Sequence, residues 1–77
     1  MTITPLSTIK PGQAGTVKKI NGTGPFFTRL RAMGLRQNVE MQVLQKAPFG
    51  GPLKVKIMGC DLAFGRKEAE QILVAIA

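Results

Sequence analysis

Hydrophobic and polar residues alternate along two stretches in the middle of the chain. Residues 39–45 (VEMQVLQ) and 53–57 (LKVKI) place hydrophobic side chains at every second position. Such alternation is typical of a strand with one buried and one solvated face. In the second stretch, Lys54 and Lys56 occupy the polar positions, so both lysines should point outward from the same face. The two stretches flank residues 46–52 and are predicted to pair as an antiparallel hairpin.

The connection between these strands, residues 47–52, reads APFGGP and lies close to several lysines. A phosphate-binding loop needs a Lys-Ser/Thr pair followed by a helix, and this loop has neither. Pro52 also lacks the N–H that a phosphate cradle would use as a donor. We therefore interpret the segment as a hairpin loop, with Pro48 at the second position of a tight turn and a glycine at positive φ. Phe49 at the tip fits two alternatives: it folds back onto the protein, or it stays exposed as a contact.

Residues 25–33 follow a helical rather than an alternating pattern. Pro25 suits the first position of a helix, and Gly34 suits the left-handed position just past its end. Hydrophobic residues recur at the spacing expected for a helix packed on a core. Arg29 and Arg31 fall on the opposite, solvent-facing side. The residues expected to face the core are Phe26, Leu30 and Met33, with Phe27 beside them.

Four further segments complete the predicted fold. Residues 16–20 form a first long strand, 62–64 a short strand, 66–71 a helical turn and 72–76 an apolar strand that closes the sheet or pairs with another chain. Regularly spaced glycine and proline turns between short strands are typical of small all-β barrels. The sequence predicts one domain over residues 1–77, an all-β fold built as a five-stranded small barrel with one short helix inserted after the first long strand.

Few residues are available for catalysis or metal binding. The chain has no histidine and one cysteine, Cys60, and its four carboxylates form no ligand motif. Cys60 and Asp61 are adjacent, but two ligands are fewer than a zinc site needs. Cys60 is expected to be buried and inert. We predict no catalytic residue, no metal ligand and no cofactor, which argues against an enzyme.

Charge and cysteine usage indicate the setting. Eleven Lys and Arg stand against four Asp and Glu, which gives a net charge of +7. A basic domain favours anionic partners: nucleic acid, an acidic protein surface or the inner membrane leaflet. A single cysteine cannot form an internal disulfide, so we expect a cytoplasmic protein. No signal peptide is evident, and no stretch approaches the roughly 20 apolar residues of a membrane span.

The order and spacing of several segments resemble the FeoA family, small cytoplasmic proteins of the bacterial ferrous iron uptake system. The resemblance covers residues 6–76. It implies an SH3-like β-barrel with an inserted helix. It also implies a partner, the large membrane iron transporter that carries a cytoplasmic GTPase domain. The segments that carry the resemblance are Leu6…Ile9…Gly12…Gly15-Thr16-Val17, RLRAMGL at 29–35, VEMQV at 39–43, APFGGPL at 47–53 and RKEA…I at 66–72.

The sequence departs from the family where members often have Pro-Gly after the Met-Gly-Leu segment. Here the two residues are Gln37 and Asn38. Asparagine tolerates the left-handed conformation, so the turn is expected to persist.

Three functional hypotheses follow. The leading one is a non-enzymatic accessory protein that binds the cytoplasmic part of the iron transporter. A basic barrel that binds nucleic acid is the second. Against it, four Phe with no Tyr or Trp leave few aromatic rings on which bases could stack. The third is a metal-sensing domain built around Cys60 and Asp61. The residues predicted to contact the partner are Phe49, Arg29, Arg31, Lys54 and Lys56.

Overall fold

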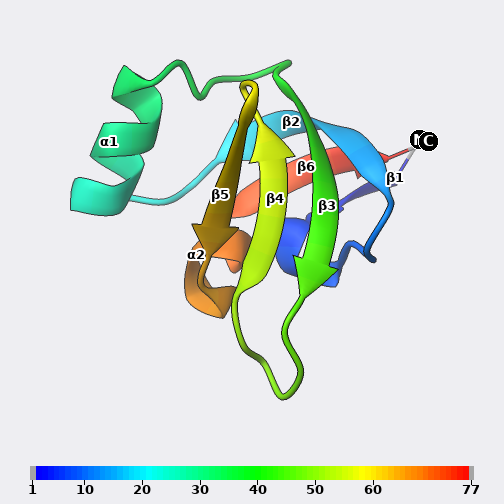
Figure 1. Ribbon diagram of the computed structural model, residues 1–77. Helices are drawn as coiled ribbons and strands as arrows, with labels where there is room; N and C mark the ends of the chain where they lie inside the picture. Colours follow the sequence, from blue (N-terminus) through cyan, green and yellow to red (C-terminus); the bar gives the residue numbers. More distant parts are fainter. Residues whose placement is uncertain (1, 77) are drawn as a thin grey trace.

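The computed structural model describes residues 2–76 as one six-stranded antiparallel sheet with two short helices (Figure 1). The strands are β1 (Thr2–Pro5), β2 (Ala14–Ile20), β3 (Glu40–Lys46), β4 (Leu53–Ile57), β5 (Cys60–Phe64) and β6 (Ile72–Ile76). The helices are α1 (Pro25–Ala32) and α2 (Arg66–Glu70), with a 3-10 turn at Leu6–Thr8. Along the sheet the strands lie in the order β1-β6-β2-β3-β4-β5.

The predicted hairpin is β3 and β4, and its alternation matches the observed burial. Val43 faces Val55 across the strand pair, and both side chains are fully buried. A bulge after Val43 leaves Leu44 half-buried. Because the inward positions fill the core, the polar positions of both strands face solvent.

β2 joins the two halves of the sheet, since it pairs with β3 along one side and with β6 along the other. Gly15 makes this junction close. A Cβ atom at Gly15 would lie 2.6 Å from the backbone oxygen of Ala75 and 2.6 Å from a methyl carbon of Val74. Only glycine therefore allows β6 to lie this close to β2.

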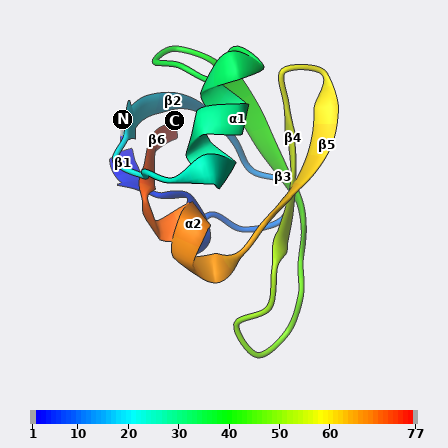
Figure 2. The same ribbon diagram turned by 90° about the vertical axis from the view of Figure 1, so that its left-hand side faces the viewer.

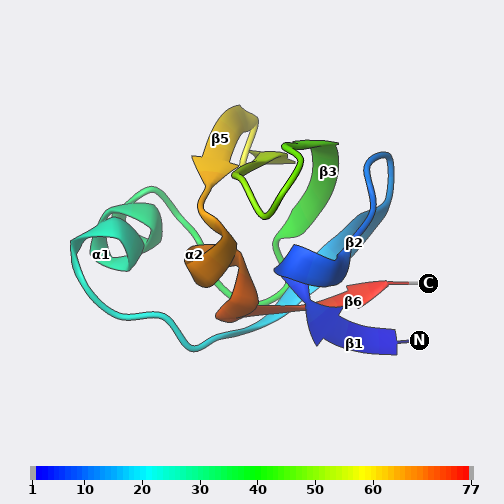
Figure 3. The same ribbon diagram turned by 90° about the horizontal axis from the view of Figure 1, so that it is seen from below.

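The sheet curls, and the helices lie at its open side. Viewed from below, it bends from β5 round to β6 and β1, with α2 between these ends and α1 outside them (Figure 3). Figure 2 shows α1 in front of the sheet in the side view. Phe27 and Leu30 of α1 enter the core, and the Phe26 ring makes edge-on contacts with Phe27 and Phe64 at centroid distances of 5.4 and 5.5 Å. The helix thus covers apolar core that the sheet leaves open.

The ends of α1 follow the predicted signals. Pro25 occupies the first turn, and Gly34 adopts a φ of 113° just past the end. Asn38 also adopts positive φ, at 74°, so the turn survives without the family's glycine. The small all-β barrel with a helix after its first long strand is therefore confirmed.

Three predictions about the fold are wrong. The sheet has six strands rather than five, because the short segment Thr2–Pro5 pairs with β6. Met33 is 45% exposed, since α1 ends before it and touches the core through Phe27 and Leu30. Cys60 is exposed rather than buried, because it begins a strand at the sheet edge, where nothing covers it.

Gly15→Ala tests the close approach of β2 and β6. We expect the free energy of unfolding to fall by about 1–3 kcal/mol, because the added methyl group must displace backbone as well as a side chain. Urea denaturation followed by circular dichroism measures the change. Ala14→Ser is the matched control, since it adds one atom to the adjacent exposed residue and should leave stability nearly unchanged. Equal stability of Gly15→Ala and the control would contradict the steric argument.

Candidate functional site

The outward face of β3, β4 and β5 carries the two predicted lysines, and we call it the lysine face. Strand pairing places Lys56 between Gln42 on β3 and Asp61 on β5. It places Lys54 between Gln45 and Ala63 in the same way. Both lysines are exposed. The two cations therefore have unequal surroundings: Lys56 lies opposite a carboxylate, and Lys54 lies opposite a methyl group. The outward residues that define the lysine face are Gln42, Gln45, Lys54, Lys56, Asp61 and Ala63.

A shallow groove of about 680 Å³ lies over part of this face. The bulge that leaves Leu44 half-buried helps to form it, since it brings an aliphatic side chain among the lining residues. Such a surface combines apolar contact with charge, as protein-binding surfaces do. The lining includes Pro11, Leu44, Pro52 and Ala63 together with the charged Lys54 and Asp61.

Phe49 stands at the tip of the β3–β4 loop, which extends beyond the sheet at the bottom of Figure 1. Its exposure is 104%, so the ring has no covering contact. Phe49 and Gly50 both have positive φ, 59° and 74°, and the N–H of Gly51 donates to the carbonyl of Pro48 at 3.2 Å. Two positive φ values are typical of a type I′ hairpin turn, with Phe49 at its second position.

This geometry corrects the predicted turn and decides between the two alternatives for Phe49. Pro48 is the first residue of the turn rather than the second. The aromatic ring is exposed and does not fold back. A bulky residue at positive φ is unusual and costs about 1–2 kcal/mol. The hairpin thus holds a large apolar side chain in water on a strained backbone.

The two arginines of α1 do not join the lysine face. Arg31 donates to the carbonyl of Gly22 at 2.9 Å, and its guanidinium lies 5.9 Å from the centre of the Phe27 ring. It therefore ties the last turn of α1 to the segment that precedes the helix. Arg29 is exposed on the same helix. Because α1 and the β3–β4 loop project from different parts of the molecule (Figure 1), the five predicted contact residues form two surfaces.

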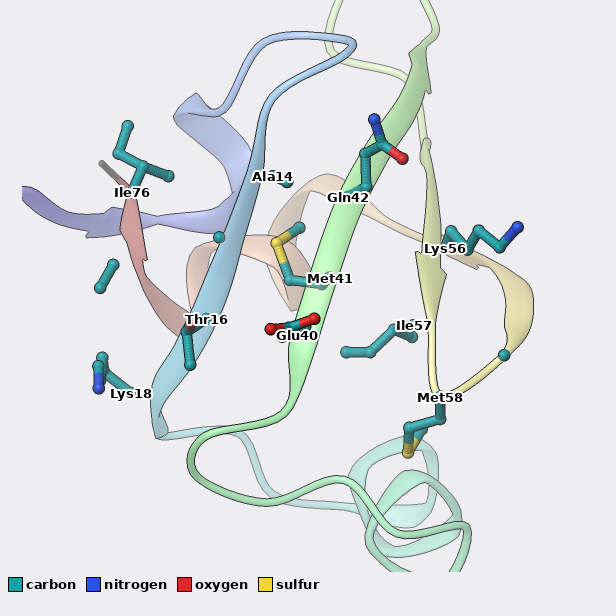
Figure 4. Close-up of a pocket in the computed structure, with 13 residues that line it drawn as sticks. Ala14, Thr16, Lys18, Glu40, Met41, Gln42, Lys56, Ile57, Met58 and Ile76 are labelled. Carbon is teal, nitrogen blue, oxygen red and sulfur yellow. The ribbon is translucent and has the colours of Figure 1, made fainter.

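A second groove, of about 540 Å³, crosses β2, β3 and β4. Figure 4 shows the carboxylate of Glu40 near its middle, between Thr16 and Ile57, while the Lys56 side chain points away to one side. Sequence reasoning missed this groove. It depends on how β2 lies beside β3, and the one available signal was the outward position of Glu40 in the alternation.

Metal-ligand residues do not cluster in the part of the chain that the structure describes. Among residues 2–76, no group of three or more His, Cys, Asp or Glu residues is placed to hold a metal ion. Cys60 pairs with the buried Ile57, whereas Asp61 pairs with the exposed Lys56. The two side chains therefore project from opposite faces of β5 and cannot bind one ion together. In the same range, no helix is long and apolar enough to span a membrane.

Comparison with known proteins identifies relatives over the whole domain. The family model described as the FeoA domain matches residues 4–76. A crystal structure of an iron uptake regulatory protein (FeoA) is 30% identical with a TM-score of 0.82, and the match covers 100% of both chains. FeoA from Chlorobium tepidum is 35% identical with a TM-score of 0.84, and the match covers 94% of this chain and 69% of that one. No match was found among curated proteins.

A further structure supports the fold alone. FeoA from Stenotrophomonas maltophilia, solved with zinc and described as a prokaryotic SH3 domain protein, is 24% identical with a TM-score of 0.78. The match covers 92% of this chain and 88% of that one. The fold is therefore SH3-like, as the resemblance implied.

Phe49→Asn tests the strain at the loop tip. Asparagine adopts the left-handed conformation more readily, and Asn-Gly is the preferred pair in a type I′ turn. We expect the free energy of unfolding to rise by about 0.5–1 kcal/mol. Urea denaturation provides the measurement. Phe49→Ala is the control, because it removes the ring and keeps an unsuitable residue in the turn. A stability gain equal in both variants would assign the effect to the ring rather than to the backbone.

Proposed function

The chain belongs to the FeoA family, whose members assist ferrous iron transport, and we propose that it acts by binding the cytoplasmic region of the membrane iron transporter that carries a GTPase domain. In this role it is a non-enzymatic cytoplasmic protein. The family match over residues 4–76 supports the iron transport context. The exposure of Phe49 is the observation that supports binding as the mode of action, since an uncovered aromatic ring does not stabilise the fold.

Phe49 has the properties of an interface anchor. Aromatic residues at the centre of an interface supply much of its binding energy. The turn fixes the backbone at Phe49 before binding, which lowers the backbone entropy lost on association. Strain that persists although a better turn residue exists is typical of functional positions. These features support Phe49 as the first contact with the transporter.

The lysine face supports the choice of partner. A net charge of +7 attracts the protein to acidic surfaces and raises the rate of encounter with them. The same charge suits a protein that works next to the anionic inner leaflet. The apolar groove beside Lys54 offers a surface for a side chain of the partner.

The two alternatives have less support. Nucleic-acid binding would need several exposed aromatic rings, yet Phe27 and Phe64 are buried, Phe26 packs between them and only Phe49 is free. Metal sensing would need Cys60 and Asp61 on one side of β5, and they lie on opposite sides. We therefore propose neither.

Titration of this protein against the transporter's isolated cytoplasmic domains tests the proposal. We expect Phe49→Ala to weaken binding about thirtyfold, since it removes a central aromatic anchor. The double variant Lys54→Glu, Lys56→Glu should weaken binding and reduce its dependence on salt, because it lowers the positive charge that attracts an acidic partner. Isothermal titration calorimetry at two salt concentrations measures both effects.

The control is the double variant Lys19→Glu, Lys67→Glu, which makes the same change of charge at two exposed positions outside the lysine face. It should leave affinity nearly unchanged. The direct-partner role fails if the wild-type protein binds neither the isolated domains nor the whole transporter in detergent at about 100 μM.

A further inference from the structure

β5 is an open edge of the sheet. It lies at one end of the strand order and pairs only with β4. Figures 1 and 2 show β5 beside β4 with no strand on its other side. In residues 2–76, no hydrogen bond from outside the β4–β5 pair reaches residues 60–64. Half of the backbone groups of β5 are thus free to pair with an added strand.

The hairpin turn fixes which groups are free. Met58 and Gly59 both have positive φ, 55° and 74°, and connect the paired residues Ile57 and Cys60. In a two-residue hairpin of this kind, the flanking pair exchanges both backbone hydrogen bonds. Alternation then turns the N–H and C=O groups of Asp61 and Ala63 away from β4. The side chains of the same two residues lie on the lysine face.

The side chains next to these free groups are electrostatically unequal. Lys56 has Asp61 opposite it on β5, whereas Lys54 has Ala63. An added strand would lie about 10 Å from β4, one strand beyond β5. A long acidic side chain placed opposite Ala63 would meet no bulky group between itself and Lys54. Opposite Asp61 an acidic side chain would be repelled.

We propose that the β5 edge accepts an extended acidic segment of a partner protein as an additional strand, with a glutamate or aspartate opposite Ala63 and an uncharged or basic residue opposite Asp61. Backbone pairing with Asp61 and Ala63 supplies affinity, and Lys54 selects the acidic residue. The inference rests on the proposed function only for the identity of the partner, the iron transporter.

The other sheet edge is a poorer acceptor. β1 ends at Pro5, which has no N–H to donate. Its neighbour β6 has the sequence ILVAI, so no charged side chain lies beside that edge to select a partner.

A second copy of this chain is a weaker occupant than an acidic partner. In antiparallel pairing with Leu62 opposite Leu62, each copy would place Asp61 opposite Ala63, so the register is permitted. However, each copy carries a charge of +7, and the contact would be limited to one short strand pair. Stable interfaces bury about 1,200–2,000 Å² in total. Charge complementarity therefore favours an acidic segment.

The test uses two capped peptides as probes, Thr-Val-Glu-Val-Thr and its counterpart with lysine in place of glutamate, titrated into the ¹⁵N-labelled protein. We expect the glutamate peptide to shift the amide signals of residues 60–64 and to slow hydrogen exchange at Asp61 and Ala63. Lys54→Glu should weaken its binding about fivefold and give a preference for the lysine peptide. Lys19→Glu is the control for charge and should bind as the wild type does.

Ala63→Pro removes one free N–H without removing a bond to β4, so both peptides should lose binding. If this variant fails to fold, the change from the glutamate peptide to the lysine peptide as the preferred ligand of Lys54→Glu still decides the question. Binding that ignores peptide charge, or amide shifts confined to other strands, overturns the proposal. A protein dimer that forms through β5 without peptide also overturns it, and sedimentation velocity detects that dimer.

The same variants separate this inference from the proposed function. If the transporter domains bind wild type and Ala63→Pro equally well, the edge is not their docking site and the proposed function stands. If the glutamate peptide binds the edge but the transporter domains do not bind the protein, the edge site stands with a different acidic partner.

Discussion

The close pairing of β6 with β2 at Gly15 is the contact on which the other parts of the structure depend. β2 belongs to both halves of the sheet, and it can do so only where its backbone lies against that of β6. The sheet curls on both sides of this contact, and α1 lies at its open side (Figure 3). β2 also pairs with β3, and the groove around Glu40 lies across that pair. The lysine face begins on β3, the strand that pairs with β2, and extends over β4 and β5.

The sequence predicted those features that depend on neighbouring residues alone, such as strand alternation, helix ends and turns. The alternation around Lys54 and Lys56 placed both on one exposed face, and proline and glycine located α1 and the hairpin loop. The errors arose where tertiary position overrides the pattern. Cys60 has the periodicity of an inward residue but lies at an edge, and Met33 has helical spacing but lies past the end of α1. The grooves could not be predicted, because each is formed by strands distant in sequence.

The β3–β4 and β4–β5 turns have the same backbone geometry but differ in whether their bulky residue packs on the protein. Each places a bulky hydrophobic residue followed by glycine at positive φ: Phe49 with Gly50 in one, Met58 with Gly59 in the other. The sulfur of Met58 lies over Gly34, 3.6 Å from where a Cβ atom would be, so its side chain contributes to packing. Phe49 is fully exposed. The same backbone strain is thus offset within the fold at one turn and not at the other.

The position of β6 also determines how the domain can fold. β6 is the last of the six strands in sequence, yet it lies between β1 and β2. Thr2 therefore pairs with Ile76, at the other end of the described residues. Contacts between such distant residues close large loops and slow folding. During synthesis, the segment up to residue 71 can form the β3–β4–β5 meander but cannot join it to β1. The sheet becomes continuous only when the ribosome has released residues 72–76, so this small domain must complete its fold after translation of its final strand.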